Sequence, residues 1–176
     1  MKLLLAIMAI VVLFVSTLSA QSSHVTSAAG SASSKDELKP LPEIKLQDFE
    51  GKAVTADALK GNVLVLDFWA TWCGPCIAEI PSLNKLQEKY GDKGVKVIGV
   101  TMASGDVADV KPFVARNKMK YTILLGDDDQ AYDFNVFAFP TTFLVTKDLK
   151  IYKRYIGTGP SKVAQIEADI QKLLKD

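Results

Sequence analysis

The sequence of 176 residues holds two cysteines, Cys73 and Cys76, with two residues between them. They follow an apolar run from Val63 to Trp69 and open a stretch with helical periodicity. Thiols at this spacing can close into a disulfide and open again. A helix N-terminus favours a thiolate, because it carries a partial positive charge and free N–H groups. We therefore expect Cys73 to attack with an exposed sulfur, and Cys76 to resolve the resulting mixed disulfide.

The two intervening residues suit this role. Pro75 fits the first turn of a helix because its missing N–H would be unpaired there, and Gly74 lets the backbone of another chain come close. Half of a zinc site and an inert structural disulfide are the other interpretations of the pair. A zinc site needs further ligands, and the single histidine, His24, lies far upstream in a polar segment. The strand before the pair and the helix after it favour redox chemistry.

Residues Asp67 to Cys76 read Asp-Phe-Trp-Ala-Thr-Trp-Cys-Gly-Pro-Cys, with Pro81 shortly after. This segment resembles the active-site segment of the thioredoxin superfamily. From about residue 40 onward the chain is similar to its extracytoplasmic TlpA/ResA-like branch, through Pro42 to Gly61, Glu79 and Phe139 to Phe143. The resemblance implies a protein disulfide oxidoreductase without a cofactor. The expected fold is α/β, a thioredoxin-like three-layer sandwich with a mixed central sheet, an N-terminal β-hairpin and an inserted strand–helix unit.

Two acidic residues are candidates for managing protons. Asp67 interrupts the apolar run, and a carboxyl buried there would tend to hold its proton. In thioredoxins the matching Asp helps to remove the proton from the second cysteine. In ResA-like proteins the Glu that matches Glu79 tunes the cysteine pair and contacts the substrate. The alternatives are an Asp67 that points to solvent at the strand end and a solvated Glu79 on a helix.

A proline late in the chain is the next candidate. In the thioredoxin superfamily the proline that matches Pro140 is cis and faces the C-x-x-C pair, which would leave the Phe139 backbone free to pair with a substrate strand. The alternative is an ordinary trans proline at a strand start. We expect the following residues to contact substrate: Trp72, Gly74, Pro75, Phe139 and Pro140.

The elements that position these residues are predicted from periodicity and turn signals. Pro81 should kink the helix that follows the cysteines, and Pro112 should split or delay the next one. Asp127 to Asp129 indicate a helix N-terminus rather than a cation site. The predicted strands span 44–46, 53–55, 63–69, 95–101, 121–125, 141–146 and 151–156, and the predicted helices span 57–59, 74–90, 106–117, 131–136 and a final one from Pro160.

The first residues read as a targeting segment. Met1 and Lys2 precede an apolar run, Leu3 to Val15, and the small residues that follow are typical of a secretory signal peptide cleaved after Ala20. The alternative is an uncleaved membrane anchor through residues 3–20. We expect a signal peptide or anchor over 1–20, a flexible linker over 21–39 and a thioredoxin-like domain over 40–176. Export to the periplasm or another extracytoplasmic space favours disulfide exchange by a lone C-x-x-C pair.

The composition limits the kinds of partner that the protein can have. The formal net charge is +1, and no basic cluster indicates nucleic acid binding. We expect neither a metal nor a cofactor. The partners should be protein thiols and disulfides. The resemblance favours apocytochrome c or another metalloprotein precursor as substrate, and a membrane thiol donor as the source of electrons. The Gly-Pro dipeptide resembles that of thioredoxin and favours a reductant.

Two other functions remain open. A peroxiredoxin-like peroxidase would have Pro seven residues and Thr three residues before the attacking cysteine, where this sequence has Leu66 and Ala70. A non-enzymatic module could carry copper on its two thiolates, although no Met or His ligand stands near them.

Overall fold

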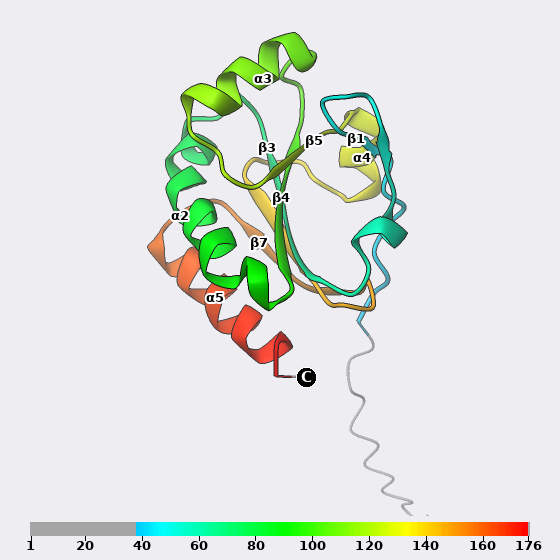
Figure 1. Cartoon of the computed structure of the whole chain (residues 1–176), viewed down its shortest axis with the longest axis vertical. Coiled ribbons are helices and arrows are strands. Elements are labelled where there is room, and N and C mark those ends of the chain that lie inside the picture. Colours follow the sequence, from blue (N-terminus) through cyan, green and yellow to red (C-terminus); the bar gives the residue numbers. More distant parts are fainter. Residues whose placement is uncertain (1–37, 176) are drawn as a thin grey trace, which may run out of the picture. The chain divides into compact units, whose positions relative to one another are not determined.

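The computed structural model describes residues 38–175. The predicted targeting segment and most of the predicted linker lie outside these residues. A seven-stranded sheet with the order β2-β1-β5-β4-β3-β6-β7 forms the centre (Figure 1). Its strands are β1 (Leu46–Gln47), β2 (Ala53–Val54), β3 (Val63–Trp69), β4 (Val95–Thr101), β5 (Thr122–Leu125), β6 (Thr141–Val145) and β7 (Ile151–Ile156). The helices are α2 (Gly74–Tyr90), α3 (Val107–Arg116), α4 (Asp128–Asp133) and α5 (Pro160–Leu173), with short 3₁₀ turns η1 (Ala56–Leu59) and η2 (Gly91–Lys93).

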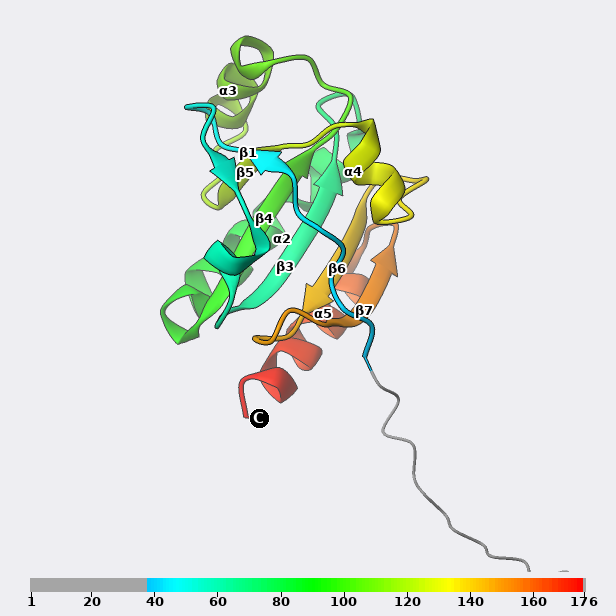
Figure 2. The same cartoon turned by 90° about the vertical axis from the view of Figure 1, so that its right-hand side faces the viewer.

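The sheet is mixed, as predicted. Strands β3, β4 and β5 run parallel, whereas β6 pairs antiparallel with β3, and β7 with β6. The hairpin of β1 and β2 joins the other edge through an antiparallel pairing of β1 with β5. Helices α2 and α5 cover one face of the sheet and α4 lies on the opposite face (Figures 1 and 2). The three-layer thioredoxin-like architecture is therefore confirmed.

Strand β3 is central because its residues, apart from Asp67, are apolar on both sides. All seven of them are buried. Val63, Val65 and Trp69 belong to the hydrophobic cluster under α2, α3 and α5. Leu64 and Phe68 belong to the cluster on the α4 side. A strand buried on both faces needs such an apolar run. The strand ends at Trp69, shortly before Cys73.

Most predicted elements lie within one or two residues of the predicted positions. The first strand, predicted at 44–46, is found at Leu46–Gln47, where these residues pair with Val54 and Ala53 of β2. Helix α4 begins at Asp128 rather than at residue 131, because the Asp127 side chain accepts a hydrogen bond from the Gln130 N–H and caps the helix there. Pro112 does not split α3, whose start is fixed upstream by a capping box between Asp106 and Asp109. The kink expected at Pro81 stays a prediction.

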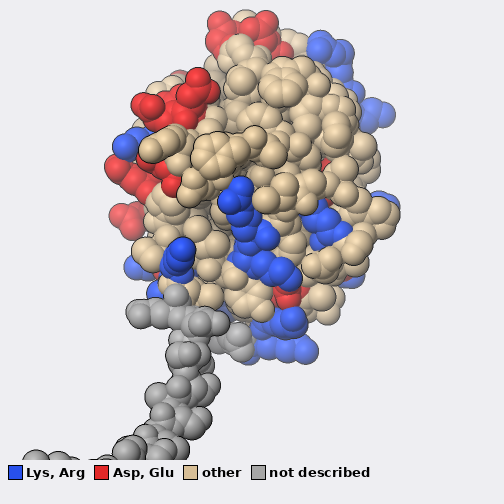
Figure 3. Space-filling model, turned by 180° about the vertical axis from the view of Figure 1, so that it is seen from behind, with Lys and Arg blue, Asp and Glu red and all other residues tan. Residues whose placement is uncertain are grey.

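Charged side chains of both signs occur on the face seen in Figure 3. Lys and Arg gather in its lower half and Asp and Glu at its upper left, with a broad uncharged area beside them. Among the described residues, no helix has the length and apolar character needed to span a membrane.

Candidate active site

The two cysteines lie where β3 passes into α2. Cys73 is the N-cap of α2, and Pro75 stands in the first turn, as predicted. Cys73 and Cys76 form a disulfide. The backbone N–H of Cys76 donates to Cys73 Sγ over 3.3 Å. A free helix N–H thus points at the sulfur, which is the arrangement that stabilises a thiolate after reduction.

The prediction of an exposed Cys73 sulfur is wrong for this disulfide form. Only 5% of Cys73 and 2% of Cys76 are exposed. Both belong to the hydrophobic cluster under α2, together with Trp69 and Ile80, since the first turn of α2 packs directly on the sheet. Little of Cys73 is therefore accessible to a partner in the disulfide form.

Exposed aromatic surface lies next to the cysteine pair. Trp72 is 65% exposed, and its indole Nε1–H donates to the Ala103 carbonyl over 2.8 Å. Its ring lies 5.9 Å from the ring of Phe139. The Phe139–Pro140 peptide bond is cis, as predicted. A side chain added at Gly74 would meet no atom within 4 Å. The structure thus brings Trp72 and Phe139 together beside the cysteines.

Asp67 lies inside the protein, so the alternative of a solvent-facing carboxyl is wrong. It is 2% exposed, and Thr142 Oγ1 donates to its Oδ1 over 2.7 Å. Burial raises the pKa of Asp67 to about 7; the charge of Glu79 adds to this rise, and Lys162 and Thr142 oppose it. A carboxyl with this pKa can both accept and return a proton near neutral pH.

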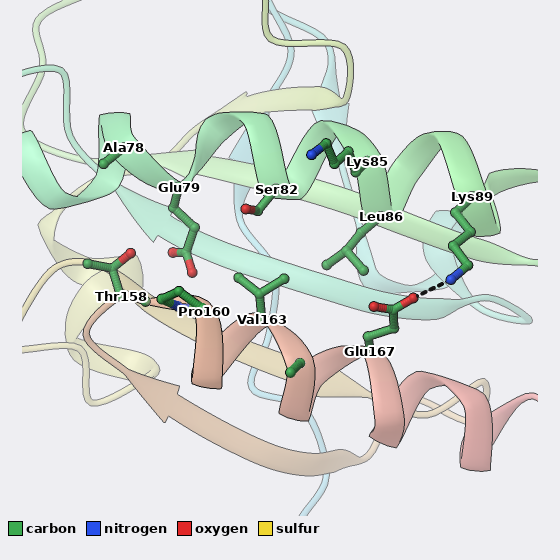
Figure 4. Close-up of a pocket in the computed structure, with 12 residues that line it drawn as sticks. Ala78, Glu79, Ser82, Lys85, Leu86, Lys89, Thr158, Pro160, Val163 and Glu167 are labelled. Atoms are coloured by element: carbon green, nitrogen blue, oxygen red, sulfur yellow. Dashed lines mark hydrogen bonds and ion pairs between the residues drawn. The ribbon is translucent and has the colours of Figure 1, made fainter.

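Glu79 is also buried, so a solvated helix glutamate is excluded. Its Oε2 accepts from Lys162 Nζ over 2.8 Å. Its Oε1 has no hydrogen-bond partner within the described part of the chain. Figure 4 shows the carboxylate directed from α2 towards the start of α5, near Thr158 and Pro160. The two predicted acids therefore lie in one buried region.

Lys162 is the residue that the sequence reasoning missed. It lies in the first turn of α5 and is 7% exposed, and its Nζ stands 4.0 Å from Asp67 Oδ1. A signal was present, because Lys162 precedes the buried Ile166 by one helical turn and so falls on the apolar face of α5. A lysine on that face needs a buried partner.

Gly99 makes room for the rings of Trp69 and Tyr121. It is the register partner of Asp67 on β4. A Cβ at Gly99 would lie 2.9 Å from Trp69 Nε1 and 3.1 Å from a ring carbon of Tyr121. Burial, and then the charges of Asp67 and Glu79, raise the pKa of the Tyr121 hydroxyl, so Tyr121 stays neutral beside the acids.

The chain matches a known protein family over most of its length. The Redoxin family model matches residues 36–170. The chain is 35% identical over 136 residues to the thiol-disulfide oxidoreductase ResA of Bacillus cereus, an alignment that covers 77% of each protein. The chain belongs to the Redoxin family. It is a thioredoxin-like thiol–disulfide oxidoreductase of the ResA type.

Other members agree with this assignment. The chain is 31% identical to the thioredoxin-like protein YneN of Bacillus subtilis, over 73% of this chain and 76% of the relative. The crystal structure of a putative thiol:disulfide interchange protein DsbE from Chlorobium tepidum superposes with a TM-score of 0.73 at 29% identity. It covers 79% of this chain and 98% of that one. The solved structure thus shares the fold over 98% of its own length.

A groove runs between α2 and α5 of this Redoxin family member (Figure 4). Its volume is about 690 Å³. Leu86 and Val163 lie between the two helices, and Glu79 lies towards the end where α5 starts (Figure 4). An ion pair of 2.6 Å between Lys89 and Glu167 joins the helices further along. Of the two predicted acids, Glu79 lines this groove and Asp67 does not.

Proposed function

We propose that this oxidoreductase reduces disulfides of partner proteins, with Cys73 as the attacking thiolate and Cys76 as the resolving thiol. The observation that carries the proposal is the Cys73–Cys76 disulfide at the N-terminus of α2, with a helix N–H directed at Cys73 Sγ. A cysteine thiol in this position has a lower pKa than an ordinary cysteine, so its thiolate is available to attack at neutral pH.

The reaction has two exchange steps. In capture, the Cys73 thiolate attacks one sulfur of a substrate disulfide, and the other substrate sulfur leaves as a thiolate and takes up a proton. In release, the Cys76 thiol loses its proton, and its thiolate attacks Cys73. The Cys73–Cys76 bond forms, the substrate sulfur leaves, and two electrons have passed from the enzyme dithiol to the substrate.

We assign the proton of Cys76 to Asp67. Asp67 alternates along β3 with Val65 and Trp69, which belong to the same hydrophobic cluster as Cys76, so its side chain is on the side of α2. Its pKa of about 7 suits a group that accepts this proton and passes it on. Trp72, Gly74, Pro75, Phe139 and Pro140 form the proposed contact surface. Support comes from the exposure of Trp72 and from the open space at Gly74.

The finer parts of the proposal concern place and partner. We propose an exported protein, periplasmic or extracytoplasmic, with a signal peptide or anchor at 1–20 and a linker at 21–39. Its proposed substrate is apocytochrome c, and a membrane thiol donor would re-reduce it. The support is the leader-like composition of residues 1–20 and the similarity to ResA. If the leader is cleaved after Ala20, sequencing of the exported protein should begin at Gln21.

Trapping tests the exchange mechanism. In a Cys76→Ser variant the release step is blocked, so partner proteins should accumulate as mixed disulfides with Cys73 that dithiothreitol releases. A Cys73→Ser/Cys76→Ser variant is the control and should trap nothing. Equal trapping by both variants would refute the assigned nucleophile.

A peptide substrate tests the finer proposal. The reduced protein should open the disulfide of an oxidised peptide that carries the Cys-x-x-Cys-His sequence of haem attachment. The control is a second oxidised peptide, in which the two cysteines are surrounded by a different sequence. Equal rates on both peptides would remove the support for apocytochrome c while leaving the oxidoreductase activity intact.

A further inference from the structure

Three ionisable side chains from three elements meet in the interior: Asp67 from β3, Glu79 from α2 and Lys162 from α5. We call them the acid–lysine triad. Lys162 Nζ lies 2.8 Å from Glu79 Oε2 and 4.0 Å from Asp67 Oδ1. All three residues are buried. A buried amine with two carboxylates is costly unless charge is balanced, so the arrangement constrains which groups are ionised.

With both carboxyl groups and the amine ionised, the triad would need one further proton to be neutral. Two carboxylates and one ammonium would leave a net negative charge in the interior, which burial disfavours. Lys162 Nζ lies closer to Glu79 than to Asp67, so Glu79 is its main ion-pair partner. Asp67, further from the amine and with a Thr142 hydroxyl beside it, is left as the carboxyl that holds the extra proton.

We propose that Lys162 is a positioning residue for the release step, because it keeps Glu79 ionised and so makes Asp67 the group that exchanges a proton with Cys76. This inference depends on the proposed function. Lys162 itself touches neither cysteine in the proposal. It acts by fixing which carboxyl is free and at which pH that carboxyl is ionised.

The other groups that face Asp67 do not compete for this role. Thr142 from β6 is neutral and donates a hydrogen bond to the carboxyl. Tyr121, just before β5, stays neutral because burial raises its pKa further above the ordinary value. Glu79 and Lys162 are thus the charges that move the titration of Asp67, and they move it in opposite directions.

The proposal predicts that removing Lys162 and removing Glu79 shift the pKa of Asp67 in opposite directions. Lys162→Met keeps the length of the side chain and removes the charge, so the pKa of Asp67 should rise by about one unit or more. Glu79→Gln removes the like charge and frees Lys162 to interact with Asp67, so the pKa of Asp67 should fall by a similar amount. A merely structural role would admit water in both variants, and both would then lower the pKa.

The direct experiment follows the Asp67 carboxyl carbon by NMR through a pH titration of the oxidised full-length protein, in which the cysteines do not titrate. Lys85→Met is the matched control, because Lys85 is an exposed lysine further along α2 and should leave the titration unchanged. A rise for Lys162→Met together with a fall for Glu79→Gln supports the proposal. A fall or no change for Lys162→Met overturns it.

A double variant protects the test against misfolding. In Glu79→Gln/Lys162→Met neither buried charge is left without its partner, and the pKa of Asp67 should lie above that of Glu79→Gln alone. Equal values in these two variants would overturn the proposal.

A kinetic readout separates this inference from the proposed function. The pH midpoint for release of a preformed mixed disulfide should move up in Lys162→Met and down in Glu79→Gln. If the NMR shifts appear while release does not follow them, Lys162 controls Asp67 but Asp67 does not serve Cys76. If no mixed disulfide forms at Cys73 at all, the proposed function fails independently of Lys162.

Discussion

Helix α5 contributes to two carboxylate–lysine clusters that behave in opposite ways. In the acid–lysine triad, burial raises the pKa of Asp67 to about 7 despite the nearby Lys162. In the second cluster, burial of Asp169 also works against its charge, but hydrogen bonds outweigh it and lower the pKa of Asp169 to about 2. Asp169 accepts these bonds from Lys172 Nζ at 2.7 Å, Tyr155 Oη at 2.8 Å and Lys153 Nζ at 3.1 Å.

The difference lies in the number of donors and in their access to water. Lys153 and Lys172 are well exposed, and no second carboxylate shares them with Asp169 among the described contacts. Lys162 is buried and divided between two carboxylates. The Asp169 cluster thus has a fixed charge and ties α5 to β7, whereas the triad is suited to exchange a proton near neutral pH.

The largest expected effect concerns the kinetics of the triad. Asp67→Asn should slow release of a mixed disulfide by about 100-fold or more, because Cys76 loses its proton acceptor. Capture by Cys73 should change little. Stopped-flow measurement of the two steps in single turnovers checks this, with Asp169→Asn as the control. Equal slowing of capture and release by Asp67→Asn would contradict the assigned role.

The next effect is on stability, with opposite signs in the two clusters. The folded-state pKa of Asp67, about 7, lies above the ordinary 3.8, so its contribution to stability is full below pH 4 and is lost as the pH rises through 7. Asp67→Asn should therefore be more stable than the wild type at pH 8 by roughly 2–4 kcal/mol, and about equal at pH 4. Urea unfolding at both pH values measures the difference; a destabilised variant at pH 8 would refute the raised pKa.

The smallest effect belongs to the Asp169 cluster. The pKa of Asp169 in the folded state is about 2, below the ordinary 3.8, so its stabilisation is present above pH 4 and is lost as the pH falls towards 2. Asp169→Asn should cost roughly 1–2 kcal/mol at pH 7, a range that allows for solvent around the lysines. The same urea series measures it. A cost that is unchanged at pH 2 would show that packing, rather than charge, stabilises this cluster.

The sequence predicts most of the fold because its signals are local. Strand β3 follows from one continuous apolar run, and α2 follows from apolar spacing after the cysteine pair. The helix N-terminus predicted at Asp127 to Asp129 is confirmed, whereas the span predicted for α4, 131–136, was displaced from the observed Asp128–Asp133. Elements with long periodic patterns are thus read more accurately than single turns.

The candidate site was predictable only in part. Cys73, Cys76 and Asp67 stand together in the sequence, and a family resemblance adds Glu79 and Pro140. The burial of Cys73 and the place of Lys162 depend on packing between distant elements; Lys162 and Glu79 are 83 positions apart. No local pattern predicts such a contact, although a lysine on the apolar face of α5 indicates that the lysine has a buried partner.

The central claim is that the start of α2 keeps the Cys73 sulfur ionised. Alkylation of the reduced protein across a pH range, with each cysteine followed by mass spectrometry, tests it most directly. Cys73 should react first, with a midpoint at least about one unit below the 8.5 of an ordinary thiol. A midpoint near 8.5, or faster modification of Cys76, would contradict the account.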